Sequence, residues 1–225
     1  MAKYGGANME KEALDAQNHH WENTYARNKE MFGQDASALA VYAVSFFNAN
    51  GKKSVLELGA GQGRDTLFFA REGFAVHALD YTTASVAEIQ KKASEQGFSH
   101  NVSALRHDVR EPLPFPDDSL DACYAHMLFC MALTTAELVF LSQEIRRVLK
   151  PKGVCIYTAR HTNDPHFGTG IHRGEDMYEV GGFIVHFFSG EKVHSLAQGF
   201  KVLDLAEFEE GALPRKLLRV TLEKI

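Results

Sequence analysis

Short apolar runs alternate with amphipathic segments along the middle of the chain. Five runs have the length and composition of strands buried on both faces of a parallel sheet. They cover residues 54–58, 74–79, 102–107, 121–125 and 154–158. Between them, apolar residues recur every three or four positions, as in amphipathic helices, over residues 64–72, 85–97 and 134–148. Strands that alternate with helices in this way predict an α/β fold with a parallel sheet.

Two short patterns locate the starts of helices. Ser85 with Glu88, and Thr134 with Glu137, have the spacing of a capping box, in which a hydroxyl and a carboxylate satisfy free backbone amides. We therefore expect one helix to begin beside Ser85 and another beside Thr134.

The first 50 residues predict a helical cap ahead of the sheet. Residues 9–32 are mostly polar, with Trp21, Tyr25 and Phe32 at helical offsets on one face. This helix either covers an edge of the sheet or forms a lid over a site. A second amphipathic helix is expected over residues 38–50. Its inward residues are expected to be Val41, Val44 and Phe47.

After the fifth strand the pattern changes to a loop and then to an antiparallel pair. Residues 160–182 are rich in glycine, histidine and aspartate, which predicts a long functional loop. Residues 183–188 continue this covering segment. A short helix and two strands complete the chain, over residues 189–198, 200–208 and 217–223. We expect the last two strands to pair antiparallel.

Composition narrows the class of protein. At 225 residues, with 45% hydrophobic and 24% charged residues, the chain fits one globular domain over residues 1–225. We divide it into the cap at 1–50 and a core at 51–225. The net charge is -5 and there is no block of Lys and Arg, so a nucleic-acid partner is not expected.

Cysteine usage and the start of the chain favour a reduced, cytoplasmic protein. Cys123, Cys130 and Cys155 lack C-x-x-C spacing and are an odd number for a disulfide framework. The first residues lack the basic-then-apolar pattern of a secretory signal. No run approaches the roughly 20 apolar residues that span a bilayer. We expect no membrane association, and either a monomer or a homodimer.

The candidate chemistry centres on a glycine loop between the first two strands. Gly59, Gly61 and Gly63 occupy alternate positions, where the backbone must turn sharply and approach a ligand closely. A helix follows at once, and the second strand is followed by Asp80. Ligands of open parallel sheets bind at this edge, where a carboxylate about 20 residues past the glycines can bond a ribose diol. These features predict a nucleoside site.

The loop also distinguishes between two kinds of nucleoside cofactor. The dinucleotide fingerprint G-x-G-x-x-G would need glycine at position 64, which is Arg64. The run E-x-G-x-G-x-G from Glu57 to Gly63 instead resembles that of the class I S-adenosylmethionine-dependent methyltransferases. The pattern H-W-x-x-x-Y around Trp21 and Tyr25 further resembles the small-molecule branch that includes the tellurite-resistance and thiopurine enzymes.

This resemblance implies a fold, a cofactor and a set of cofactor contacts. The fold is a Rossmann-like three-layer α/β sandwich, with a seven-stranded mostly parallel sheet and an antiparallel last strand. The cofactor is S-adenosyl-L-methionine, and its product is S-adenosyl-L-homocysteine. The family pattern places Asp80 on the ribose hydroxyls and Asp108 on the adenine amino group. The positions expected at the cofactor are Glu57, Gly59, Ala60, Gly61, Gly63, Arg64, Asp80, Tyr81, Asp108, Val109 and His126.

The implied reaction is methyl transfer to a small-molecule acceptor by in-line displacement at the sulfonium methyl. It needs alignment of the acceptor, exclusion of water, and a base where the nucleophile must lose a proton. Histidine suits that last role near neutral pH. The candidate catalytic residues are His126, His161, His166 and His186. Acceptor contacts are expected from Trp21, Tyr25, Met127, Phe129 and Tyr178.

Three alternatives remain open. An NAD-dependent dehydrogenase would use a similar sheet, although Arg64 replaces the third fingerprint glycine. A non-enzymatic sensor would bind S-adenosylmethionine without turnover. A metal site on the histidine-rich loop is the third, but the spacing of His161, His166 and His172 matches no short ligand signature, so no metal is expected.

Overall fold

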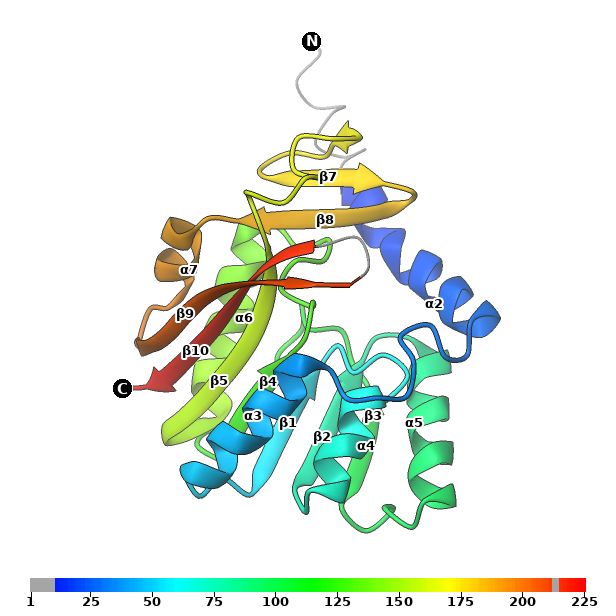
Figure 1. Ribbon diagram of the computed structural model, residues 1–225, viewed down its shortest axis with the longest axis vertical. Helices are drawn as coiled ribbons and strands as arrows, with labels where there is room; N and C mark the ends of the chain where they lie inside the picture. Colours follow the sequence, from blue (N-terminus) through cyan, green and yellow to red (C-terminus); the bar gives the residue numbers. More distant parts are fainter. Residues whose placement is uncertain (1–10, 212–214) are drawn as a thin grey trace.

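The computed structural model describes residues 11–211 and 215–225. Strand pairing joins ten strands of these ranges into one sheet, and seven of them follow the order β3-β2-β1-β4-β5-β10-β9 (Figure 1). Strands β1 to β5 are parallel, β10 is antiparallel to β5, and β9 is antiparallel to β10. Their bounds are β1 Ser54–Leu58, β2 Ala75–Asp80, β3 Val102–Arg106, β4 Leu120–Ala125, β5 Leu149–His161, β9 Phe200–Glu210 and β10 Arg215–Lys224. The predicted Rossmann-like sheet, with its antiparallel last strand, is confirmed.

Helices cover both faces of the sheet and complete three layers. They are α3 Ala38–Ala49, α4 Arg64–Arg71, α5 Thr83–Glu95, α6 Thr135–Val148 and α7 Gly190–Leu196. Helices α3 and α4 pack on one face, with α5 beside α4, whereas α6 and α7 pack on the other face (Figure 1). Successive residues of a strand point to opposite faces of the sheet. Val55 therefore packs in the core on the α3 and α4 face, and Leu56 packs in the core on the α6 and α7 face.

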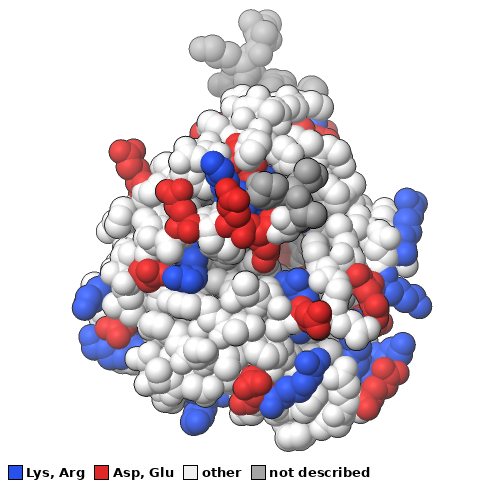
Figure 2. Space-filling model, in the orientation of Figure 1, with Lys and Arg blue, Asp and Glu red and all other residues white. Residues whose placement is uncertain are grey.

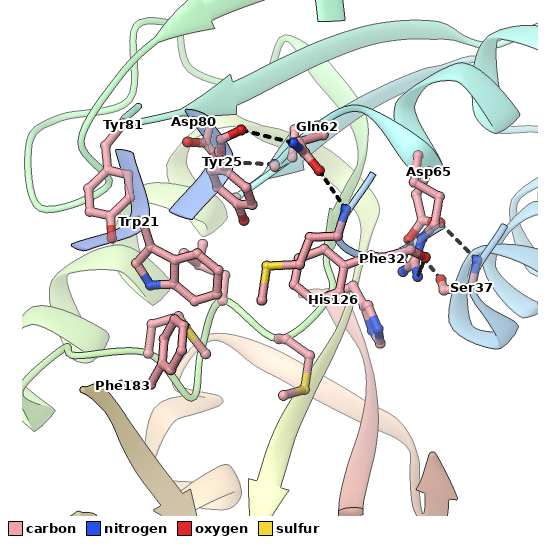
Figure 3. Close-up of a pocket in the computed structure, with 18 of the residues that line it drawn as sticks. Trp21, Tyr25, Phe32, Ser37, Gln62, Asp65, Asp80, Tyr81, His126 and Phe183 are labelled. Carbon is pink, nitrogen blue, oxygen red and sulfur yellow. Dashed lines mark hydrogen bonds and ion pairs between the residues drawn. The ribbon is translucent and has the colours of Figure 1, made fainter. Parts of the chain in front are cut away.

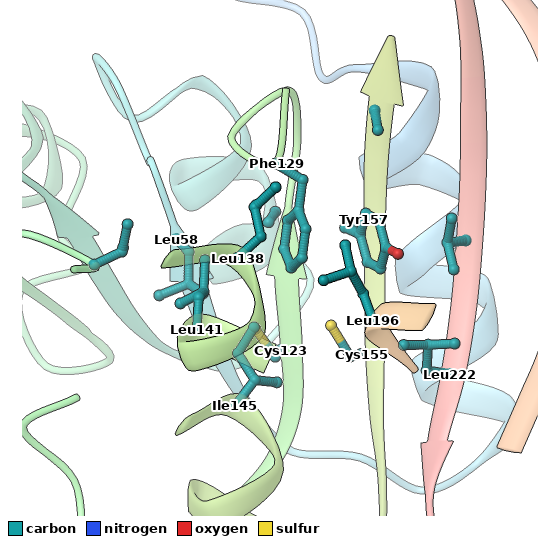
Figure 4. Packing of buried hydrophobic residues seen from close by; sticks show 14 of the residues in the cluster. Leu58, Cys123, Phe129, Leu138, Leu141, Ile145, Cys155, Tyr157, Leu196 and Leu222 are labelled. Carbon is teal, nitrogen blue, oxygen red and sulfur yellow. The ribbon is translucent and has the colours of Figure 1, made fainter. Parts of the chain in front are cut away.

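The larger core lies between the sheet and α6 (Figure 4). The apolar stripe predicted for this helix is buried, with no member more than 1% exposed: Leu138, Leu141, Ile145 and Val148. On the same side, the ring of Phe129 stacks on Tyr157, with centroids 3.9 Å apart and planes 13° apart. This stacking places Phe129 in the core, whereas the sequence analysis expected it at the acceptor.

One of the two predicted capping boxes is present. At the start of α6, the Thr134 hydroxyl accepts from the Glu137 amide, and the Glu137 carboxylate accepts from the Thr134 amide. The box predicted at Ser85 is wrong, because α5 begins earlier. Its N-cap is Thr82, whose hydroxyl accepts from the Ser85 amide. Strand β2 ends at Asp80, which leaves only a short turn before the helix.

Part of the loop predicted over residues 160–182 is instead an antiparallel sheet. Strands β6 (Ile171–His172), β7 (Met177–Val180) and β8 (Phe183–Phe188) pair in succession, and β8 also pairs with the end of β5 (Figure 1). Gly181 and Gly182 form the turn from β7 to β8 with φ of 61° and 85°. Two of the glycines that suggested a loop are therefore the turn residues of the β7–β8 hairpin.

The first helix is shorter than the predicted span of 9–32. Helix α2 covers Gln17–Arg27 and is capped at Asn28; residues 11–15 are also helical, and residues 9 and 10 lie outside the described ranges. Phe32 lies beyond α2, although its ring centroid is still 6.5 Å from that of Trp21. No helix in the described ranges is long and apolar enough to cross a membrane.

Helix α3 has the predicted position but a different buried stripe. Val44 and Phe47 are buried as expected, whereas Val41 is 51% exposed. The stripe also includes Leu39, Ala40 and Ala43. Because successive helical residues are about 100° apart, the five buried residues share one side of α3, and Val41 falls outside it, next to Val44.

Candidate active site

A cavity of about 830 Å³ lies at the carboxyl ends of β1, β2 and β4. It is lined by the glycine loop after β1, the segments after β3 and β4, the segment from α2 to the start of α3, strands β7 and β8, and the end of the β9–β10 hairpin. Figure 2 shows this face of the molecule hollowed near its centre, and Figure 3 shows the lining side chains. This edge of the sheet is where open parallel sheets bind ligands.

The glycine loop brings bare backbone to the cavity. The amides of Gly59 and Ala60 donate to the Leu79 carbonyl at 2.8 and 3.1 Å, which joins the loop to β2. Gly61 has a φ of +53°, and a Cβ atom on it would lie 3.2 Å from the Tyr25 hydroxyl. The missing side chain therefore lets α2 and a ligand approach the loop closely.

Asp80 is fixed at the end of β2, beside this loop. It is 5% exposed, and its Oδ2 accepts from the Gly61 amide at 2.9 Å. Its Oδ1 accepts from the amide and the hydroxyl of Thr82 at 2.9 and 2.7 Å. Burial raises the pKa of Asp80, although these three donors favour the ionised form. The carboxylate is thus held in one orientation at the cavity, next to Tyr81.

Two further acidic side chains line the cavity from β1 and α4. Burial, followed by the nearby Asp65 carboxylate, raises the pKa of Glu57 well above its usual range. Burial also opposes ionisation of Asp65, but Arg64 and the Ser37 amide lower the pKa of Asp65 overall. The Ser37 amide and hydroxyl donate to Asp65 at 2.9 and 2.7 Å. The pair therefore comprises one carboxyl that favours its neutral form and one carboxylate.

Asp108 and Val109 line the cavity after β3. Both carboxylate oxygens of Asp108 accept from Arg110, at 2.7 to 3.1 Å. Burial opposes ionisation of Asp108, but these bonds lower its pKa overall. Arg110 also donates to Asp15 in the N-terminal segment. An adenine contact at Asp108 would have to share the carboxylate with Arg110.

Helix α2 lies across the cavity (Figure 3). The Trp21 ring is 4.9 Å from the ring of Phe183 on β8, between centroids. Gln17 bonds the backbone on both sides of Phe183: it donates to the Gly182 carbonyl at 2.9 Å and accepts from the Ile184 amide at 3.2 Å. This placement favours the lid interpretation of α2 over a helix that only covers an edge of the sheet.

Gln62, which sequence analysis missed, fastens the glycine loop to the segment after α2 (Figure 3). Its Nε2 donates to the carbonyls of Tyr25 and Asn28 at 3.4 and 2.6 Å, and its Oε1 accepts from the Met31 amide at 3.1 Å. The side chain is buried and each of its polar atoms is bonded. Gln62 lies inside the glycine motif, so its hydrogen bonds hold the glycine loop against the end of α2 and the segment that follows it.

His126 follows β4 and lines the cavity. Its Nδ1 lies 3.1 Å from the Thr158 hydroxyl, and its Nε2 lies 3.3 Å from Oε2 of Glu210 at the end of β9. The bond from His126 lowers the pKa of Glu210. The ring is therefore held between two strands, with a carboxylate against one of its nitrogens.

The structure brings two of the four candidate histidines to the cavity, His126 and His166. His161 lies outside it, and its Nδ1 accepts from the Asn163 amide at 2.9 Å. His186 also lies outside and is fully buried, with Nδ1 donating to the Leu133 carbonyl at 2.6 Å.

Three further predicted residues lie outside the cavity. Phe129 is in the core, and Tyr178 packs edge-on against Phe187. Gly63 lies under the loop, where a Cβ atom would come within 2.7 Å of Ile89. The other predicted cofactor and acceptor positions all line the cavity: Trp21, Tyr25, Glu57, Gly59, Ala60, Gly61, Arg64, Asp80, Tyr81, Asp108, Val109, His126 and Met127.

Several cavity residues were not predicted as site residues, although Arg160 and Phe183 lie in the covering segment that the sequence predicted. Arg160, Phe183, Glu210 and Arg215 lie far from the glycine loop in sequence and reach the cavity through strand pairing. Gln62 could have been found, since it occupies a variable position of the motif itself. Over residues 11–211 and 215–225, no group of three or more His, Cys, Asp or Glu side chains is arranged to hold a metal.

Comparison with known proteins adds an independent finding. Residues 55–153 match a family model described as a methyltransferase domain. A phosphoethanolamine N-methyltransferase from Triticum aestivum is 37% identical over 102 residues, 45% of this chain and 19% of that protein. A sterol 24-C-methyltransferase from Gibberella zeae is 30% identical over 179 residues, 71% of this chain and 43% of that protein. The chain thus spans less than half the length of these curated relatives.

Solved structures share the fold over nearly the whole chain. A 1,6-didemethyltoxoflavin-N1-methyltransferase from Burkholderia thailandensis, with bound 1,6-didemethyltoxoflavin and S-adenosylhomocysteine, has a TM-score of 0.75 at 19% identity. The match covers 95% of this chain and 89% of that one. TehB from Haemophilus influenzae has a TM-score of 0.68 at 14% identity, over 91% of this chain and 67% of that one. At these identities the likeness is one of fold.

Proposed function

Because the chain belongs to the class I S-adenosylmethionine-dependent methyltransferases, we propose that it transfers a methyl group from S-adenosylmethionine to a small-molecule acceptor. The curated relatives named above carry the names of small acceptors, phosphoethanolamine and a sterol. The two other functions considered, an NAD-dependent dehydrogenase and a non-enzymatic sensor, gain no support from these comparisons.

The observation that supports this proposal most strongly is that one cavity joins a nucleoside site to a covered apolar space. Bare backbone at Gly59 and Gly61 leaves room that side chains would fill, and the Asp80 carboxylate is oriented toward it. A volume of about 830 Å³ accommodates a nucleoside with its amino acid side arm and a small acceptor. We propose that Asp80 bonds the ribose hydroxyls and that Glu57, Arg64, Tyr81 and Val109 contact other parts of the cofactor.

The chain's own residues would align the acceptor, exclude water and hold a proton. When bound, S-adenosylmethionine supplies an electrophilic methyl group on its sulfonium. Trp21 and Phe183 would cover the acceptor, since their rings meet above the cavity. The His126–Glu210 pair would hold the proton that an O–H, N–H or S–H acceptor loses. Alignment for in-line attack supplies much of the rate enhancement in such a reaction.

The covered cavity also limits the class of partner. Helix α2 and strands β7 and β8 enclose the acceptor side, so a macromolecular acceptor would not enter easily. We infer that the protein acts without nucleic acid, in the cytoplasm, as a monomer or homodimer. Acidic and basic side chains are interspersed on the face shown in Figure 2, which supports the first of these inferences.

Two measurements test the proposal. Calorimetry should detect binding of S-adenosylmethionine and S-adenosylhomocysteine but not of NAD. A screen of small O-, N- and S-acceptors with methyl-labelled cofactor should then give a labelled product. Binding of NAD alone would refute the family role, and cofactor binding without transfer to any acceptor would favour the sensor.

A further inference from the structure

One end of the cavity presents hydrogen-bond donors from three segments. Arg160 comes from the end of β5, His166 from the segment after it, and Arg215 from the start of β10. We call these three residues the donor cluster. Leu217 on β10 is paired with Arg160 on β5, which brings the start of β10 to Arg160, and His166 reaches Arg160 through a side-chain contact.

Arg160 is held in place before any ligand binds. Its side chain is 6% exposed, and its Nε and Nη2 donate to the carboxylate of Asp164. That carboxylate is itself anchored, because the amides of His166 and Lys216 donate to it at 2.9 and 2.8 Å. The Arg160 guanidinium also lies 5.5 Å from the centroid of the Phe187 ring. These contacts use Nε and Nη2, and no described residue hydrogen-bonds to Nη1, so Nη1 is available to donate to a ligand.

The contact between Arg160 and His166 determines which nitrogen of His166 carries its proton. Nη2 of Arg160 lies 3.2 Å from Nδ1 of His166. A guanidinium can only donate, so Nδ1 must accept and the ring proton of neutral His166 lies on Nε2. His166 therefore also acts as a donor at this end of the cavity.

Arg215 contributes a positive charge that its described surroundings leave without an ion-pair partner. No described carboxylate lies within 4.0 Å of its guanidinium. Asp164 is turned to Arg160, and Glu210, the cross-strand neighbour of Arg215, is bonded to His126. The donor cluster thus combines one paired and one unpaired guanidinium among the described residues.

Apart from the His126–Glu210 pair, the rest of the acceptor side is mostly apolar. Aromatic rings and thioethers line it, together with aliphatic side chains, and the rings of Trp21 and Phe183 face each other there (Figure 3). Its main members are Trp21, Phe32, Phe183, Met127, Met131 and Val185. A polar molecule without an apolar body would leave this surface uncovered.

We propose that the acceptor is an amphipathic small molecule, with an aromatic or other apolar body and a carboxylate or phosphate group bound by the donor cluster. A planar oxyanion can take two donors from Arg160 and His166, while Arg215 supplies charge. This proposal rests on the proposed function, because it specifies the substrate class of the same cavity.

The test compares matched probes on protein saturated with S-adenosylhomocysteine, so that the cofactor part of the cavity is filled. Benzoate, phenyl phosphate and neutral benzamide are titrated by ligand-observed NMR. We expect benzoate or phenyl phosphate to bind at least about ten-fold more tightly than benzamide, as for charge-assisted bonds. Preference for benzoate alone would identify a carboxylate, and preference for phenyl phosphate alone a phosphate; both outcomes support the proposal.

Two variants separate the donor cluster from a general effect of charge. Arg215→Gln should reduce the preference for the anionic probe by about five-fold or more. Arg219→Gln is the matched control on the same strand, because Arg219 pairs with Asp204 outside the cavity and should leave the preference unchanged. Equal binding of benzoate, phenyl phosphate and benzamide, or a preference that survives Arg215→Gln, would overturn the proposal. Failure of S-adenosylhomocysteine to bind is read separately by calorimetry, and it would reject the proposed function instead.

Discussion

Asp80 is the side chain on which the cofactor assignment depends most. We expect Asp80→Asn to weaken S-adenosylmethionine binding by about 1.5–3 kcal/mol, because a charge-assisted bond to the ribose is lost. Asparagine keeps the shape of the side chain, and its one oxygen can still accept from Thr82, but its amide nitrogen cannot accept from the Gly61 amide, so the fold of the variant is checked first. Calorimetry measures the effect, with Asp204→Asn, outside the cavity, as the control. Unchanged affinity in a folded Asp80 variant would remove Asp80 from the cofactor site.

Substitutions at Gly61 and Tyr25 are expected to have coupled effects on cofactor binding. A Cβ atom on Gly61 would lie 3.2 Å from the Tyr25 hydroxyl, and its φ of +53° disfavours a side chain. We predict that Gly61→Ala weakens cofactor binding, and that Tyr25→Phe in the same protein recovers part of the loss by removing the hydroxyl. A double-mutant cycle by calorimetry measures the coupling. Additive effects would mean that α2 does not lie against the loop in solution.

Glu57 is expected to make stability depend on pH. Burial and Asp65 raise its pKa in the folded state. Above the unfolded pKa of about 4.3, the folded state binds more protons at this site than the unfolded state does, so stability falls as pH rises toward the folded pKa. Glu57→Gln removes this titration, so its stability relative to wild type should improve as pH rises above the unfolded pKa, by up to about 1.4 kcal/mol per pH unit. Urea unfolding across this range checks it, with exposed Glu72→Gln as control. A difference independent of pH would contradict the buried titration.

For single residues, the sequence predicted the site correctly where the local backbone conformation fixes a residue at the cavity. The prediction failed where a side chain can point either into the cavity or into the core. The loop from Glu57 to Arg64 and the strand-end residue Asp80 line the cavity, apart from Leu58 and Gly63, because short-range geometry fixes them. Met127 and Phe129 follow the same strand and looked equivalent, yet Met127 has a φ of 65° and lines the cavity while Phe129 stacks in the core. Packing decides between such neighbours, and a pattern of residue types does not contain it.

Among the elements, the joint between the glycine loop and α2 has a direct test. Gln62→Ala would break the bonds to Tyr25, Asn28 and Met31, so the end of α2 should open more often. We predict faster tryptic cleavage at the exposed Arg27 and Lys29 than in wild type. S-adenosylhomocysteine should protect these sites in wild type and less in the variant.

Gln90→Ala is the matched control, since Gln90 is outside the cavity lining and its side chain donates to the Ala104 carbonyl. Equal cleavage of Gln62→Ala, Gln90→Ala and wild type would mean that α2 is held by other contacts alone. Gln17 and Glu22 would then be the next bonds to remove, because they join α2 to β8 and to the start of α5.

Helices and strands were predicted correctly where the pattern of apolar residues runs through the whole element. The five parallel strands and the helix α6 have long apolar patterns, and the structure places each close to the expected residues. The β6–β7–β8 sheet was missed because its strands are short and its turns carry many glycines. The end of β5, residues 159–161, was missed for another reason: Arg160 and His161 are polar, although they are buried where β5 pairs with β8 and β10.

At the scale of the whole molecule, three segments far apart in sequence close one cavity. Sequence analysis predicted two of them, the N-terminal helix and the segment after β5. The third, the β9–β10 hairpin, was predicted as strands, but nothing indicated that Glu210 and Arg215 would reach the site. Its contribution follows from the length of the two strands, which run beyond the edge of the parallel sheet (Figure 1).

The lid role of the N-terminal segment gives the last prediction. Removing the residues before Tyr25 deletes Gln17, Trp21 and Glu22, and with them the bonds to β8 and α5, but leaves the loop and Asp80 in place. Methyl transfer should therefore fall far more than cofactor affinity, because water gains access and the acceptor loses its cover. Trp21→Ala is the companion variant, since it opens the same cover while the helix and its polar bonds stay. Both should lower kcat/KM for the acceptor with a small change in the Kd of S-adenosylhomocysteine. If both variants fold and transfer methyl groups at the wild-type rate, α2 is a structural cover of the sheet and the acceptor must be enclosed by β8 and the β9–β10 hairpin alone.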